Sequence, residues 1–156
     1  MKKYFALLVF AFLFLVSGIS NAQLLITSMK DIVETVSDKI KYLEDNLDQE
    51  VVNITIDLLV GSAGEKTVYR NLDNSFDYKL ILIGDKKIAK LKIEVNKKTG
   101  DKWILVDKTS GENVTLDIFP DNRALYEFII KADTYNPDYT AGHFAFILYH
   151  KDPLKK

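Results

Sequence analysis

Residues 89–95 read Ala-Lys-Leu-Lys-Ile-Glu-Val, and apolar and charged side chains alternate along the whole stretch. Successive side chains of a β-strand point to opposite faces, so this alternation predicts a strand with one face on a core and one in water. Gly84-Asp85 before the stretch and residues 96–101 after it are rich in turn formers. The stretch therefore predicts one strand of an antiparallel sheet that has a single buried face.

The same period of two recurs on both sides of this strand. Residues 51–60 alternate between apolar side chains and Asn53, Thr55 and Asp57, which predicts another half-buried strand. Short strands spaced by turn signals predict a β-sandwich or barrel, here a sandwich of about eight antiparallel strands. The expected strands are 51–60, 66–72, 76–82, 89–95, 102–107, 114–118, 125–132 and 143–150.

Residues 28–48 predict a single amphipathic helix before the strands. Ser28 can cap its first turn, and Asp31 suits the positive end of the helix dipole. The fold class is then α+β, mainly β, with the helix packed on the sandwich. Association with a partner helix is the alternative, although the stripe spans just under three heptads and coiled coils need three to four. The apolar stripe consists of Met29, Val33, Val36, Ile40, Leu43 and Leu47.

The first 22 residues resemble a secretory signal peptide. Lys2 and Lys3 precede an unbroken apolar run, Phe5 to Val16, and small residues lead to Ala22. A helix of twelve residues reaches ~18 Å, short of the ~30 Å hydrocarbon core, which argues against a membrane anchor. We expect cleavage before Gln23 and a periplasmic or extracellular location, in a bacterium by its lysine-rich composition, with no membrane span left after cleavage.

The expected mature chain, residues 23–156, is a single domain of 134 residues (156 less 22). It carries 19 basic residues (21 less Lys2 and Lys3) and 22 acidic ones, a net charge of −3. This balance argues against a nucleic-acid partner, which would need a basic face. The sequence has no cysteine, so burial alone must stabilise the domain.

The last two expected strands resemble the end of bacterial pre-peptidase C-terminal domains, which are secreted β-sandwiches. The likeness rests on residues 125–132, the tyrosine-bearing loop Tyr135 to Tyr139, and the strand start Gly142-His143-Phe144. It covers about the last quarter of the mature chain, whereas the acidic Asp-Leu-Tyr strand of that family is absent. The resemblance implies a non-catalytic accessory domain that binds a protein or polysaccharide, and it transfers no site residue.

Catalytic groups are scarce in the sequence. No cysteine or Gly-x-Ser-x-Gly motif is present, and His143 and His150 are seven residues apart on one expected strand, so they should face opposite sides. Asp57, Asp117 and Glu127 occupy polar strand positions, where we expect solvent-facing charges. A pair of carboxylates across a cleft would be needed for the alternative function, a small secreted hydrolase.

Calcium is the one cofactor with any ligand pattern, and the sequence predicts no other. Asp121, Asp133 and Asp138 offer loop carboxylates, which this hard cation prefers. Aspartate is also an ordinary turn residue, and turn formation is the favoured interpretation.

Three aromatic residues, Trp103, Tyr135 and Tyr139, are candidate ligand-binding residues that could together form a stacking surface for a sugar or peptide. Trp103 shares its strand parity with Leu105 and Asp107, so core packing and exposure are both open. The leading hypothesis is an exported, non-catalytic binding or interaction module. A carboxylate-dependent hydrolase and an envelope structural protein that associates through its N-terminal helix are the alternatives.

Overall fold

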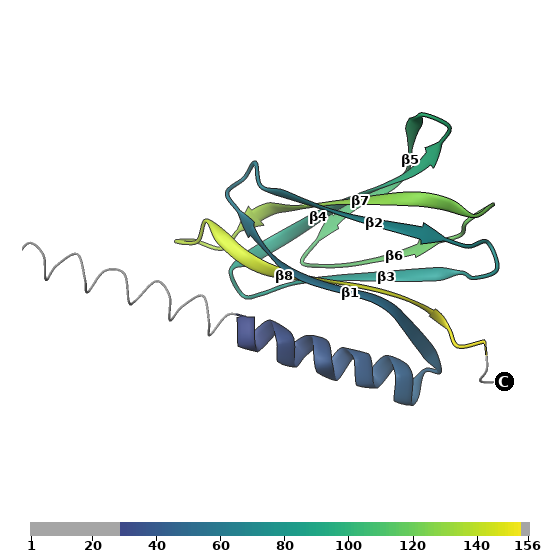
Figure 1. Ribbon diagram of the computed structural model, residues 1–156. Helices are drawn as coiled ribbons and strands as arrows, with labels where there is room; N and C mark the ends of the chain where they lie inside the picture. Colours follow the sequence, from purple (N-terminus) through teal and green to yellow (C-terminus); the bar gives the residue numbers. More distant parts are fainter. Residues whose placement is uncertain (1–28, 154–156) are drawn as a thin grey trace, which may run out of the picture.

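The computed structural model describes residues 29–153, and these form two stacked four-stranded sheets with one helix on the outside (Figure 1). The chain is helical over 29–46, ending in the π-helical turn η1, and all eight expected strands are present. The predicted fold class is thus confirmed. The elements are η1 (Tyr42–Asn46), β1 (Gln49–Val60), β2 (Glu65–Leu72), β3 (Tyr78–Gly84), β4 (Ile88–Thr99), β5 (Lys102–Gly111), β6 (Asn113–Ile118), β7 (Ala124–Tyr135) and β8 (Ala141–Lys151).

Both sheets are antiparallel throughout. Sheet A has the strand order β1-β8-β3-β6, and sheet B has the order β2-β7-β4-β5. The main core fills the space between them, where Phe128 of β7 meets Phe146 of β8. Residues 89–95 lie in β4, and Leu91, Ile93 and Val95 are fully buried in this core.

β8 is buried on both faces, which explains why its sequence does not alternate. Phe144, Phe146 and Leu148 face sheet B, whereas Ala145 and Ile147 belong to a second core under the helix. A strand covered on both sides needs an unbroken apolar run, as residues 144–149 provide.

The helix packs on its own domain, although the predicted stripe was only partly correct. Val36 and Leu43 are buried against sheet A, and Ile32 joins them where Val33 was expected. Leu47 follows the π-turn as its C-cap, where φ of −119° no longer continues the helix, and its side chain is exposed. Met29 and Val33 are exposed as well.

Ser28 and residues 1–22 lie outside the described residues, so the expected cap, signal peptide and cleavage site stay predictions. Within residues 29–153, no helix has both the length and the apolar composition needed to cross a bilayer.

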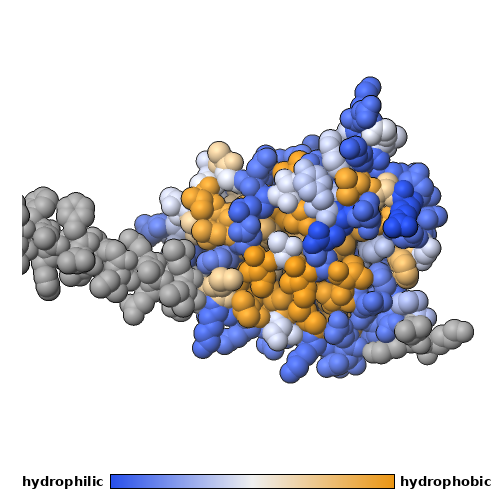
Figure 2. All heavy atoms as spheres, in the orientation of Figure 1, coloured by the Kyte–Doolittle hydropathy of each residue, from blue (hydrophilic) through white to orange (hydrophobic). Residues whose placement is uncertain are grey.

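β1 turns its alternating apolar side chains away from the main core. Ile54 pairs with Ile147 and Ile56 with Ala145, so this apolar set lies on the outer face of sheet A beside the helix. The most extensive apolar area in Figure 2 lies over β1, where Val52 and Ile54 are exposed. The polar side chains of Asn53, Thr55 and Asp57 point instead toward the space between the two sheets.

The sequence predicted that Asp57 faces solvent, but this side chain lies between the edges of the two sheets. Its carboxylate lies 2.8 Å from Lys66 Nζ of β2 and joins the edges of the two sheets. Burial alone would raise the pKa of Asp57, but hydrogen bonds from Lys66 and from the Leu58 N–H outweigh it and hold this pKa below its ordinary value of 3.8.

Asp57 should make stability fall at acid pH. Because its folded pKa is depressed, its contribution is complete above about pH 4 and is lost as the pH falls through the lower folded value. The free energies of unfolding of wild type and Asp57→Asn in urea should differ by less than about 1 kcal/mol at pH 7, because the pair is half exposed, and should converge once the pH falls below the folded pKa. A gap that is constant from pH 7 to pH 2 would contradict this linkage.

Candidate functional site

The outer face of sheet B is open, whereas the helix covers much of the outer face of sheet A. No element within residues 29–153 lies on sheet B from outside (Figure 1). Tyr69 of β2 and Trp103 of β5 are respectively 49% and 38% exposed on this side, at either edge of the sheet. Two large aromatic side chains exposed to water on one sheet are uncommon enough to make this face a candidate binding surface.

The two rings are neighbours across the sheet. Their centroids are 5.9 Å apart and the planes are tilted by 39°, so they form a bent surface rather than a flat platform. Lys98 Nζ lies 5.8 Å from the centre of the Trp103 ring, within the range of a cation–π contact. Trp103 and Lys98 are register partners, which places the cation and the indole on one face.

Glu127 of β7 fixes the middle of this face. Its two carboxylate oxygens accept hydrogen bonds from the Tyr69 hydroxyl (2.9 Å) and from the Asn96 amide (3.1 Å). The hydrogen bond to Glu127 raises the pKa of Tyr69. Glu127 was expected to be a plain surface charge; it instead orients Tyr69 beside Trp103, and its capacity for a ligand is reduced.

The β4–β5 hairpin extends beyond the sandwich at the edge of sheet B (Figure 1). Gly100 supplies the left-handed backbone of its turn, with φ of +59°. Next to Trp103, the side chains of Ile104, Leu105 and Val106 are 50%, 51% and 49% exposed. We call these four residues the apolar arm. Four consecutive exposed apolar residues on an edge strand are a surface poised to pair with another chain.

A register shift explains why the sequence alone could not decide whether Trp103 is buried or exposed. Asn96 pairs with Leu105 while its neighbour Val95 pairs with Asp107, so β5 has one extra residue at this point. The extra residue breaks the alternation, and Leu105 and Asp107 do not share a face. The missed signal was the run Trp103–Val106 itself, four apolar residues without alternation.

The structure does not bring the three predicted aromatic residues together. Tyr135 pairs with Ile88 at the start of β4, whereas Trp103 pairs with Lys98 near its end, about 30 Å away along the strand. Tyr135 packs against the main core, its hydroxyl lies 3.4 Å from the Gly61 carbonyl, and burial raises its pKa. Tyr139 is exposed in the β7–β8 loop, with Lys87 Nζ 5.8 Å from its ring centre.

The predicted calcium ligands are also dispersed. Asp121 precedes β7 and is held by Lys97, whose hydrogen bond lowers the pKa of this carboxyl. Asp133 lies near the other end of β7, and Asp138 has φ of 71° in the following turn. Among residues 29–153, no three His, Cys, Asp or Glu side chains are grouped to hold a metal ion.

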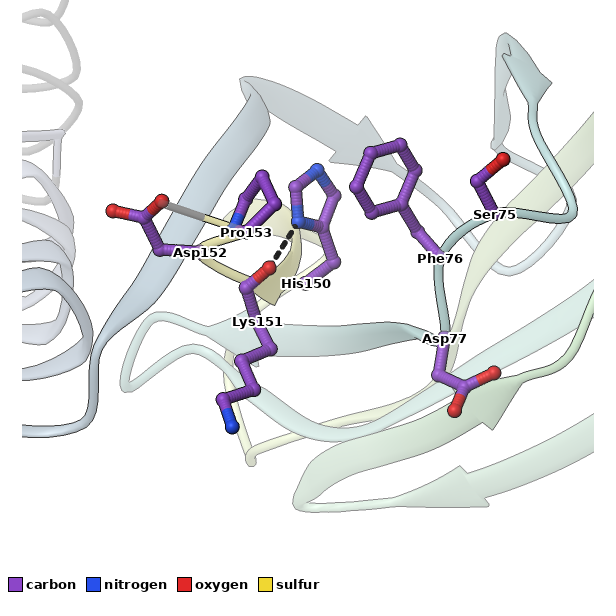
Figure 3. A pocket seen from close by; sticks show the side chains of 7 residues that line it. All are labelled: Ser75, Phe76, Asp77, His150, Lys151, Asp152 and Pro153. Atoms are coloured by element: carbon purple, nitrogen blue, oxygen red, sulfur yellow. Dashed lines mark hydrogen bonds between the residues drawn. The ribbon is translucent and has the colours of Figure 1, made fainter. Parts of the chain in front are cut away.

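A separate hollow of about 380 Å³ lies where β8 ends (Figure 3). His150 stacks on Phe76 at 4.1 Å, and its Nδ1 is 2.8 Å from the Lys151 carbonyl oxygen. In Figure 3 the Asp77 and Asp152 carboxylates point away from the imidazole. His143 and His150 are both buried, whereas the sequence predicted that they would be partly solvated. The aspartates that line this hollow do not form a pair of catalytic carboxylates beside His150.

No protein-family model matches the chain, and neither does any curated protein. Solved structures do share the fold. CorA, a surface-associated copper-binding protein of Methylomicrobium album BG8, is 8% identical with a TM-score of 0.53, over 62% of this chain and 92% of that one. At this identity the likeness shows a common fold.

Two further solved structures have lower scores. The pre-peptidase C-terminal domain of Bacillus anthracis collagenase, from the family that residues 125–148 resemble, is 9% identical with a TM-score of 0.45 over 62% of this chain and 87% of that one. A CBM4 structure is 9% identical with a TM-score of 0.39 over 71% of this chain and 79% of that one.

Proposed function

We propose that the chain is an exported, non-catalytic interaction module that binds an extended segment of another protein along β5. The apolar arm carries this proposal, because its aliphatic side chains stay in water on a strand whose outer edge meets no described strand. A bound strand would satisfy the free backbone groups of β5 and bury these side chains. The apolar leader supports export, and a mature chain recovered from the medium or periplasm with Gln23 first would establish it.

A protein partner explains the arm better than a polysaccharide does. Sugar sites combine stacked aromatic rings with free hydrogen-bonding groups, but the rings are tilted here and Glu127 is already bonded to Tyr69 and Asn96. The aliphatic side chains of Ile104, Leu105 and Val106 cannot form hydrogen bonds with the hydroxyl groups of a sugar. A β-strand of another protein can pack its own apolar side chains against them.

The extra residue in β5 argues against pairing with a second copy. The register shift leaves Leu105 and Asp107 on different faces, so two copies of this bulged strand would not match face to face in a two-fold antiparallel pair. A regular strand of another protein meets no such mismatch between two bulges. Acidic residues opposite Lys102 and Lys108 would be attracted to these lysines, so we infer an acidic, apolar segment of another protein.

Trp103, the single tryptophan of the chain, is a built-in reporter for this interaction. The probe is a synthetic strand of five alternating threonines and valines with a glutamate at each end, compared with the same strand ended by lysines. We expect the glutamate strand to shift Trp103 emission to shorter wavelength and to bind at least about tenfold more tightly than the lysine strand, with the difference shrinking in high salt.

Leu105→Lys should weaken binding of the glutamate strand by about tenfold or more, because it places a hydrated charge in the contact. The matched control is Val60→Lys, which changes an exposed valine on the edge strand of the other sheet and should bind like wild type. Equal binding by both variants, or a response of Trp103 to soluble oligosaccharides and to neither peptide, would reject the proposal.

A further inference from the structure

A second surface, independent of the apolar arm, lies on the opposite side of the molecule between the helix and β6. It is a groove of about 610 Å³, a size typical of small-molecule sites. Ile81 and Ile83 of β3 form its floor, and Thr115 of β6 lines one side.

The groove exists because the helix covers only part of sheet A. Val36 and Leu43 anchor the helix over the middle strands, and the outward side chains of β6 remain uncovered. Two salt bridges lie on residues of the elements that form the groove. Lys86 reaches Asp31 of the helix at 3.7 Å, and Lys79 reaches Asp117 of β6 at 3.5 Å.

The helical wall carries a cation and an aromatic ring. Lys39 Nζ lies 5.6 Å from the centre of the Tyr42 ring, and both residues line the groove. Lys39 is half-buried, and within residues 29–153 no carboxylate forms a salt bridge with it, whereas Lys79 and Lys86 are each paired with an aspartate. Asp38 also lines the groove, but its side chain is exposed. The half-buried charge of the groove is therefore positive.

The helix changes its geometry at this wall. The helix ends here in a π-turn that begins at Tyr42, and turns of this kind occur at helix C-termini. Leu43 is buried beneath the turn, while the Tyr42 ring is 49% exposed over the groove. The turn therefore leaves a large aromatic ring beside the apolar floor of the groove.

We propose that the groove binds a small amphipathic anion, a fatty-acid-like carboxylate. Its apolar chain would lie on Ile81 and Ile83 against the Tyr42 ring, and its carboxylate would meet the Lys39 ammonium. Asn113 and Thr115 on the β6 side can donate further hydrogen bonds to the carboxylate. This ligand matches the groove in size, in the apolar character of the floor and in the sign of the half-buried charge.

Decanoate is the probe, and methyl resonances of isoleucine, leucine and valine in the full mature chain are the readout. We expect saturable shifts at Ile81 and Ile83, with the methyls of Ile104, Leu105 and Val106 unmoved. Lys39→Gln should weaken decanoate binding by about five- to tenfold while leaving the binding of the uncharged decanol unchanged. Lys30→Gln is the matched control, since Lys30 is an exposed lysine of the same helix that pairs with Glu34.

Tyr42→Ala should weaken decanoate and decanol alike, because it removes the apolar wall and leaves the cation. Shifts confined to the apolar arm, or shifts at all exposed methyls together, would show nonspecific adsorption and overturn the proposal. Equal affinity of Lys39→Gln and wild type for decanoate would overturn it as well. Neither result depends on binding of the synthetic strands to β5.

Discussion

Replacing Phe128 with alanine should lower the free energy of unfolding by about 3–5 kcal/mol, the usual cost of removing a buried phenylalanine ring. Phe128 is fully buried in sheet B, and its ring meets Phe146 of sheet A edge-on, with centroids 5.1 Å apart at 66°. The change removes apolar burial and leaves a cavity at the contact between the sheets. Without cysteine, no disulfide offsets the loss.

Chemical denaturation monitored by circular dichroism measures the change. Phe119→Ala is the matched control, since Phe119 is 70% exposed and the same truncation there should alter the unfolding free energy by less than about 0.5 kcal/mol. Losses of equal size at the two positions would contradict the assignment of Phe128 to the core. A double-mutant cycle with Phe146→Ala should give a coupling of about 0.5–1.5 kcal/mol for the ring pair.

The fold was predictable wherever the sequence pattern is local. Residues 89–95 alternate with a period of two and lie in β4, with Leu91, Ile93 and Val95 in the core. Before residue 49 the apolar residues recur with a helical period, which correctly predicted the helix. The unbroken apolar run 144–149 agrees with a strand that is covered on both faces.

Features that depend on long-range register were not predictable. The alternation of residues 51–60 predicted a half-buried strand but not which of its faces would meet the main core. Ile54 and Ile56 lie on the outer face of sheet A, whereas Asp57 faces the other sheet and meets Lys66. Alternation reveals that a strand has two different faces, not which neighbour each face will meet.

The candidate site on sheet B could not be predicted from the sequence, because it also depends on long-range strand register. Trp103 was identified, but Tyr69 is 34 positions earlier and reaches it only through the pairing of β2, β7, β4 and β5. The π-turn at Tyr42 leaves no propensity signal either, because it forms where a helix must bury Leu43 and end against β1.

Asp85→Ala should cost about 2–4 kcal/mol, although the residue lies in a turn. Its side chain is only 2% exposed, and its two oxygens accept hydrogen bonds from the backbone N–H groups of Lys87 and His143, both at 2.9 Å. Alanine would leave these two buried donors without their acceptor, at about 1–3 kcal/mol each when water cannot replace it. A β-carbon on Gly142 would come within 2.9 Å of Asp85 Oδ1, so little room is left for relaxation.

Asp73→Ala separates this effect from the loss of an ordinary turn aspartate. Asp73 also accepts the N–H of the residue two positions on, Ser75, at 2.9 Å, but near solvent. Its removal should cost less than about 1 kcal/mol, because water can bond the freed N–H. Equal unfolding free energies for the two variants would contradict the role of Asp85. A larger loss at Asp85, with faster amide exchange at Lys87 and His143, would show that this buried carboxylate joins the β3–β4 turn to the start of β8.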